Sequence, residues 1–164
     1  MKKLIMLCGA LTLGACRQAP SPEPAPAGRP AASAPAPARP SNQVGADNAR
    51  GAVTAFLTAV EQGDLQALSA VWGDSTGLTR DRTDRTELEK REYVLSCYLR
   101  HDRYTILSEA PNPGAGRVFA VEMRLGNLTR TVNFTTLLGP QKRWFVYNIS
   151  DLDKLQPFCQ QKKP

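Results

Sequence analysis

The residues with the most distinctive chemistry in this 164-residue chain are its four cysteines and its single histidine. Cys8 and Cys16 lie near the N-terminus, whereas Cys97, His101 and Cys159 lie in the C-terminal half. A cysteine thiol can form a disulfide, bind a metal ion or act as a nucleophile. With one histidine and no C-x-x-C pair, the chain lacks a closely spaced set of metal ligands. We therefore expect no metal site.

The residues before Cys16 have the order of parts that is typical of an export signal. Lys2 and Lys3 are followed by an apolar run, residues 4–13, and then by small residues. A positive start and a short apolar core are typical of a secretory signal peptide. The run is well short of the roughly 18 residues that a membrane-spanning helix needs.

The end of this signal, Leu13-Gly14-Ala15-Cys16, resembles the lipobox of bacterial lipoproteins. In that family the cysteine thiol receives a diacylglycerol, and a peptidase then cleaves just before the cysteine. The resemblance implies a signal peptide over residues 1–15 and an acylated Cys16 that anchors the protein to the lipid bilayer. An ordinary signal peptide with a cysteine near its cleavage site is the alternative.

The lipobox also predicts where the protein lies. The anchored chain would face the periplasm or the cell exterior. Arg17 follows the cysteine, where aspartate would resemble the inner-membrane retention signal of enteric bacteria. In a host with two membranes this favours the outer membrane.

Residues 16–41 are predicted to form an anchor and a disordered tether, because residues 19–40 are nearly all Ala, Pro, Ser and Gly. Such a segment cannot bury enough apolar surface to fold, and it favours extended polyproline conformations. At about 3.1 Å per residue, it could hold the next domain several nanometres from the bilayer. A proline-rich ligand for a binding groove is the alternative.

The charge of the chain argues against a nucleic-acid partner. Without Lys2 and Lys3, the chain has 19 basic and 15 acidic side chains, so its net charge is +4. A mild positive excess on a tethered domain suits anionic lipid headgroups. No recognition helix, zinc finger or aromatic–basic RNA signature accompanies it.

Cys97 and Cys159 are the pair that remains once Cys8 leaves with the signal peptide and Cys16 is acylated. An exported compartment is oxidising, so an even number of remaining cysteines predicts a Cys97–Cys159 disulfide. Two free thiols would suit a reducing compartment.

Residues 42–164 are long enough for one domain, and their patterns change from helical to extended. Residues 47–62 place Ala49, Val53, Phe56, Leu57 and Val60 on one helical face. Residues 64–72 repeat the pattern, with Gly63 as a helix stop and Asp64 as an N-cap. After a loop over residues 73–85, Thr86 and Glu89 match a capping box that would open a third helix through about Leu99. Its apolar positions are Leu88, Val94, Leu95, Tyr98 and Leu99.

After His101 four segments alternate in polarity and are rich in Val, Ile, Thr and aromatic residues, as strands are. They cover residues 103–110, 117–126, 129–139 and 143–150. Short turns between them predict an antiparallel meander. The expected fold is α+β, with three N-terminal helices packed on a curved four-stranded antiparallel sheet.

The helical opening, "AVTAFLTAVEQGDLQALSAVW", is similar to the first helix pair of the nuclear transport factor two and ketosteroid isomerase superfamily. Members continue with a third helix and a strongly bent sheet, the cystatin-like or cone fold. The resemblance covers about residues 45–155 and is closest to small lipoprotein domains of unknown function. Enzymes of this superfamily use an aspartate base and a tyrosine oxyanion donor in the cone. No position here matches those motifs closely enough to carry a role over.

Several polar residues remain as candidates, each with a structural explanation of its own. The charged stretch 79–92 alternates in sign, which is typical of a solvated face. Arg80, Arg82 and Arg85 are a candidate anion site near the start of the third helix. Glu122 is expected to face solvent. His101 is expected at the C-terminus of a helix, where a basic side chain interacts favourably with the helix dipole. The other candidate site residues are tyrosines and acids outside the strands: Tyr93, Tyr98, Tyr104, Tyr147, Asp74, Asp81 and Asp102.

These observations favour a non-catalytic function. No catalytic, phosphate-binding or cofactor-binding motif is present, and no cofactor is expected. The sequence predicts a membrane-anchored envelope lipoprotein that binds a small apolar ligand or a protein partner, or that forms a homodimer through its sheet face. The alternative is an isomerase, dehydratase or hydrolase that uses the cone pocket.

Overall fold

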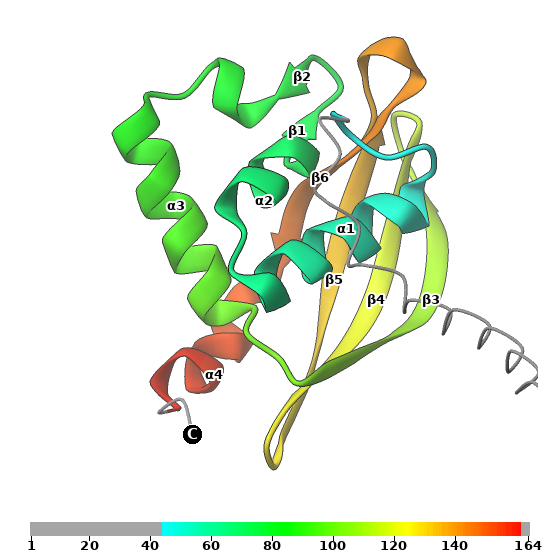
Figure 1. Ribbon diagram of the computed structural model, residues 1–164. Coiled ribbons are helices and arrows are strands. Elements are labelled where there is room, and N and C mark those ends of the chain that lie inside the picture. The colour runs from blue at the N-terminus through cyan, green and yellow to red at the C-terminus, as the bar shows by residue number, and fades with distance from the viewer. Residues whose placement is uncertain (1–43, 162–164) are drawn as a thin grey trace, which may run out of the picture. The chain divides into compact units, whose positions relative to one another are not determined.

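The computed structural model of the protein describes residues 44–161, which form an α+β domain (Figure 1). The predicted signal peptide and tether lie outside the described residues. Four α-helices are present in this part of the chain: α1 (Ala49–Gln62), α2 (Leu65–Val71), α3 (Arg85–Tyr98) and α4 (Gln156–Gln160).

The main sheet has four antiparallel strands in the order β3-β4-β5-β6. Their bounds are β3 (Arg103–Asn112), β4 (Gly116–Leu125), β5 (Leu128–Leu138) and β6 (Trp144–Ser150). Phe119 lies opposite Phe134, and Val121 lies opposite Val132. The register shifts beside Leu107 in β3 and beside Tyr147 in β6, and both side chains are exposed. The predicted four-stranded meander is confirmed.

The first two helices begin and end at the predicted signals. Asn48 Oδ1 accepts a hydrogen bond of 2.7 Å from the Gly51 amide at the start of α1. Gly63 ends α1 with a φ of 67°, a left-handed conformation that favours glycine. Asp64 then accepts from the Ala67 amide at the start of α2. All five predicted apolar positions of α1 are buried.

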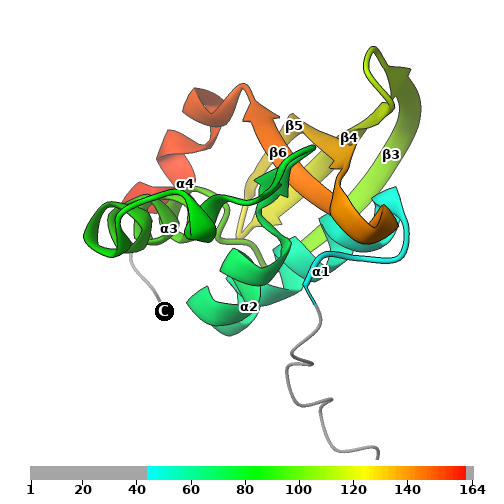
Figure 2. The ribbon, with the colours of Figure 1, turned by 90° about the horizontal axis from the view of Figure 1, so that it is seen from above.

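Helix α1 lies across one face of the sheet (Figures 1 and 2). Aromatic side chains pack between the helix and the sheet. Phe56 of α1 meets Phe134 of β5 edge to face, with ring centroids 6.2 Å apart. The buried phenylalanines are Phe56, Phe119, Phe134, Phe145 and Phe158. Because this core draws only on residues within 49–158, the described part has the core of an independent domain.

The expectation that three helices pack on the sheet needs correction. Helix α3 packs against α2 and α4 and stands beside the edge strand β6 (Figure 1). Only Leu88 and Glu92 within α3 are buried, and Val94 is 48% exposed. The helix is rich in charge, so it has too few apolar side chains to bury a broad face.

Short elements also appear outside the predicted helices and strands. The loop over residues 73–85 contains a hairpin, β1 (Gly73–Asp74) and β2 (Gly77–Leu78), and the 3₁₀ helix η1 (Thr79–Asp81). The 3₁₀ helices η2 (Pro140–Lys142) and η3 (Leu152–Leu155) flank β6, and α4 follows η3. None of these elements is longer than five residues, which is too short for a hydrophobic periodicity to be recognised.

The segment before α1 is attached to the start of β6. Ala46 and Trp144 exchange two backbone hydrogen bonds of 2.9 and 2.8 Å. The Arg143 guanidinium donates to the carbonyl oxygens of Val44 (3.1 Å) and Gly45 (2.8 Å), and it also pairs with Asp47. The first described residues are therefore part of the folded domain.

The N-cap of α3 is Asp84 and not Thr86, which corrects the predicted capping box. Asp84 Oδ1 accepts hydrogen bonds from the amides of Thr86 (2.9 Å) and Glu87 (3.2 Å). We expect Asp84→Ala to lower the free energy of unfolding by about 1 kcal/mol. Thr86→Ala is the matched control and should cost little, because alanine favours the helix interior. Urea unfolding checks both, and a larger loss for Thr86→Ala would contradict the assignment.

Candidate functional site

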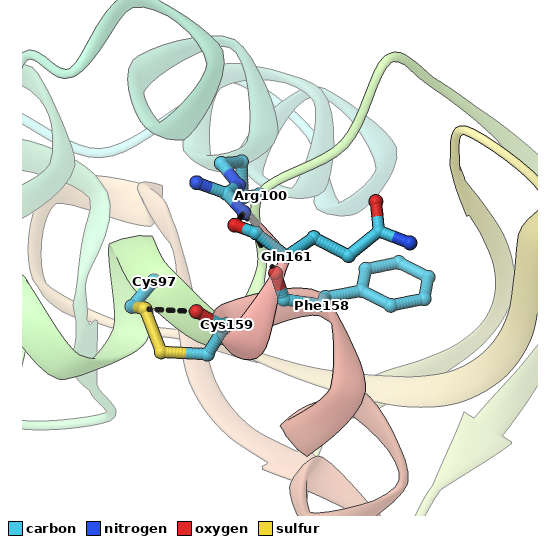
Figure 3. Close-up of a disulfide and its surroundings, with 5 residues drawn as sticks. All are labelled: Cys97, Arg100, Phe158, Cys159 and Gln161. Carbon is cyan, nitrogen blue, oxygen red and sulfur yellow. Dashed lines mark hydrogen bonds between the residues drawn. A yellow bond between two sulfur atoms is a disulfide. The ribbon is translucent and has the colours of Figure 1, made fainter. Parts of the chain in front are cut away.

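Cys97 and Cys159 form the predicted disulfide, which joins the end of α3 to α4 (Figure 3). Their Cα atoms are 4.8 Å apart. Arg100 strengthens the same junction, because its Nη2 donates to the carbonyl oxygen of Phe158 at 2.9 Å and to that of Gln161. The disulfide prediction is confirmed. Cys16, the predicted acylation site, lies outside the described residues.

The three arginines of the candidate anion site each have a carboxylate partner. Arg82 pairs with Asp74 at 2.9 Å, Arg85 pairs with Glu89 at 2.8 Å, and Arg80 lies 4.0 Å from Asp81. Three different acids thus engage the three guanidinium groups. An incoming anion would have to displace these carboxylates, so the anion site stays a prediction.

Asp74 is part of the turn before η1 and is not a loose loop acid. Its Oδ1 accepts hydrogen bonds from the Thr76 amide and hydroxyl, both at 2.7 Å. Burial alone would raise the pKa of Asp74, but the hydrogen bonds from Thr76 and Arg82 outweigh it and lower the pKa below its usual value. This carboxylate stabilises the hairpin, and its two oxygens already interact with Thr76 and Arg82.

Glu92 is the most unusual titratable residue, and its burial corrects the expectation that residues 79–92 form a solvated face. It is 2% exposed, and its Oε1 has no hydrogen-bond partner within the described part of the chain. Burial raises its pKa to about 7, the nearby Glu89 carboxylate adds to the shift, and Arg80 opposes it. Leu88, Glu92, Leu95 and Leu99 share the spacing of a buried helical stripe. That spacing was the signal that could have identified Glu92 as buried.

His101 lies just after the end of α3, as expected, and its side chain is buried there. It is only 7% exposed, and its Nδ1 lies 2.8 Å from the Leu99 carbonyl oxygen. Its ring meets the Tyr104 ring edge to face at 5.4 Å. Because a ring nitrogen beside a carbonyl must donate, Nδ1 carries a proton, and His101 closes the end of α3.

A cleft opens between the C-terminal ends of α1 and α3, with a volume of about 480 Å³. Tyr93, Arg100, His101 and Asp102 contribute to its wall. Tyr93 is 73% exposed, and Asp102 accepts a 2.7 Å hydrogen bond from the Gly126 amide. Both side chains are exposed to solvent, so the cleft does not enclose a catalytic acid and its partner.

A second opening runs along α3 and is apolar. We call it the α3 groove, and its volume is about 470 Å³. The residues that line it are Trp72, Glu87, Lys90, Arg91, Val94 and Leu95. Trp72 follows α2 and bridges to Val146 of β6, whereas the other five residues come from successive turns of α3.

The remaining candidates have structural roles. Glu122 pairs with Arg124 at 3.1 Å on the sheet face that points away from α1, as expected for a solvated position. Tyr147 is exposed, and Tyr98 and Tyr104 pack at the edge of the core. Among residues 44–161 no group of three acidic, histidine or cysteine side chains is placed to hold a metal ion. No helix in this range is long and apolar enough to cross a membrane.

Comparison with known proteins adds no assignment. No protein-family model matches the chain, and no curated protein is significantly similar to it.

Proposed function

We propose that the protein is an exported lipoprotein whose acylated Cys16 anchors a non-catalytic binding domain in the cell envelope. The observation that carries the proposal is the Cys97–Cys159 disulfide. Structural disulfides persist in oxidising compartments and are rare in the cytosol. The disulfide therefore supports export, which the N-terminal signal predicts independently.

The packing of the domain supports binding at its surface over chemistry in its interior. The order of helices and strands fits the cone superfamily, but the space between α1 and the sheet holds Phe56, Phe119 and Phe134, all buried. The face of the sheet opposite α1 has no helix over it in the described domain (Figure 2). That face suits a second copy or an envelope protein, and the α3 groove suits a small apolar ligand.

The enzymatic alternative has less support. An isomerase, dehydratase or hydrolase of this superfamily would need an acid and a tyrosine that converge in a desolvated pocket. Glu92 is a desolvated acid, but the neighbouring Tyr93 is exposed and points to solvent. The two side chains therefore do not form such a pair.

Labelling at Cys16 tests the anchor directly. We expect the full chain, expressed in a bacterium fed an alkyne-tagged fatty acid, to take up label and to sediment with membranes. Cys16→Ser should lose the label, because only the thiolate can accept the lipid. Cys8→Ser, in the predicted signal peptide, is the matched control and should keep it. Label that persists on Cys16→Ser would refute the anchor.

A further inference from the structure

We propose that the α3 groove binds a long-chain fatty acid, with the hydrocarbon chain along Trp72, Val94 and Leu95 and the carboxylate at Lys90. This inference rests on the proposed function, since it names the ligand class and the site of the binding domain. It uses a surface that neither the disulfide nor the buried core occupies.

The groove has an apolar floor in a helix that is otherwise charged. Val94 is 48% exposed, although a valine on a solvated helix face gains nothing from its position. Trp72 and Leu95 beside it are partly buried against the core. An open apolar surface rimmed by polar side chains is typical of a ligand-binding groove.

The size of the groove matches a single hydrocarbon chain. A methylene group fills about as much space as a water molecule, about 30 Å³, so 470 Å³ holds about 15 such groups. Trp72 and Leu95 also line a smaller cavity of about 120 Å³. Tyr147 and Asn148 line that cavity together with Phe56, Val146, Ile149 and Leu152, so it is of mixed polarity and the hydrocarbon chain is assigned to the groove alone.

The charges at the rim favour an anionic head. Glu87 pairs with Arg91 at 2.8 Å, and Glu89 pairs with Arg85 at 2.8 Å. Lys90 is exposed and has no carboxylate partner in the described domain, so it is the cation that a ligand can neutralise. An exposed ion pair is weak, so Lys90 orients the ligand while the hydrocarbon chain supplies most of the affinity.

The dimensions of the groove argue against a protein partner. A stable protein interface buries about 1,000 Å² or more of surface around an apolar centre. Here the apolar floor consists of three side chains, and the Glu87–Arg91 ion pair borders it. A single chain of methylene groups covers that floor, whereas a protein surface would also have to bury the Glu87–Arg91 ion pair.

Fluorescence titration tests the proposal, because Trp72 and Trp144 are the only tryptophans of the chain. The chain from Arg17 onward keeps the whole described domain, and Trp144→Phe leaves Trp72 as the sole reporter. We expect palmitate, added below its micellar concentration, to change Trp72 fluorescence saturably at micromolar levels. Calorimetry on the chain without the Trp144 substitution should give the same affinity.

Two pairs of matched variants locate the site. Val94→Asp should weaken palmitate binding by about tenfold or more, because it places a charge on the apolar floor. Leu107→Asp, at a similarly exposed apolar residue on the opposite edge strand, should bind as the parent does. Lys90→Glu should weaken binding about threefold, and Arg130→Glu, which changes charge equally at the far end of β5, should not.

Several results would overturn the proposal. These are the absence of a saturable signal, equal effects of Val94→Asp and Leu107→Asp, and binding of the uncharged alcohol of the same length as tightly as palmitate. Binding to anionic vesicles without palmitate saturation would assign the groove to a membrane surface instead. None of these results alters labelling at Cys16, so failure of the ligand and failure of the anchor are distinguishable.

Discussion

Replacing Cys97 and Cys159 together with alanine is expected to lower the free energy of unfolding by about 4 kcal/mol. The disulfide closes a loop with a sequence separation of 62 residues, and the loop-entropy relation gives this value for such a loop. Domains of this size are stable by roughly 5–15 kcal/mol, so the loss is a large share of the total. Urea unfolding of the oxidised domain and of the double variant measures it.

The reduced wild-type domain is the internal control for this experiment. Reductant should bring the wild type to the stability of the double variant and leave the double variant unchanged. Helix α4 should be affected first, because it has five residues and no side-chain N-cap. A difference below about 1 kcal/mol between oxidised and reduced protein would contradict the prediction.

Glu92→Gln is expected to stabilise the domain above neutral pH, by about 3 kcal/mol at pH 8. An unfolded glutamate ionises near its usual pKa of 4.5, whereas folding raises the pKa of Glu92 to about 7. The folded state therefore binds the proton more tightly. Wild-type stability falls as pH rises from 4.5 to 7, by about 1.4 kcal/mol per pH unit. Glutamine stays neutral and avoids this cost.

The difference in free energy of unfolding between Glu92→Gln and the wild type should depend on pH. That dependence distinguishes an effect of ionisation from a general packing effect. At pH 4, where Glu92 is protonated in both states, Glu92→Gln and the wild type should have nearly equal stability. Glu61→Gln, on the exposed end of α1, is the matched control and should follow the wild-type curve. A gain for Glu92→Gln that is the same at pH 4 and pH 8 would refute the assignment to ionisation.

The elements that could be predicted from the sequence are those with strong local signals. Three kinds of local signal each specify an element without contacts from the rest of the chain. They are the apolar stripe from Ala49 to Val60, the Gly63-Asp64 joint and the four alternating segments. The boundaries of the strands agree within a few residues, because Gly114, Gly126 and Gly139 interrupt the alternating patterns at the turns. The cysteine pairing followed from counting thiols and from the expected compartment.

The features that could not be predicted depend on distant parts of the chain. Helix α4 contains Pro157 and is held in place by Phe158, Arg100 and the disulfide, so no local pattern identifies it. His101 is buried because the connection from α3 to β3 is bonded to the end of β4 through Asp102 and Arg124 and packs against Tyr104. Glu92 is buried because α3 packs against α2. The α3 groove needs Trp72 from one helix end and Val94 from another helix, which only the folded chain brings together.

The attachment of the first described residues to β6 has a mechanical consequence. A pull on the chain before Val44 loads the Arg143 hydrogen bonds and the paired backbone of Ala46 and Trp144 before it reaches α1. Force is thus diverted into an edge strand that the sheet supports along its length, while the opposite end of the domain is closed covalently by the disulfide. Ala46 and Trp144 also pack against the hydrophobic core between α1 and the sheet, so the core supports this attachment from within. Tension applied at Val44 is therefore borne first by the β6 edge of the sheet and not by the start of α1.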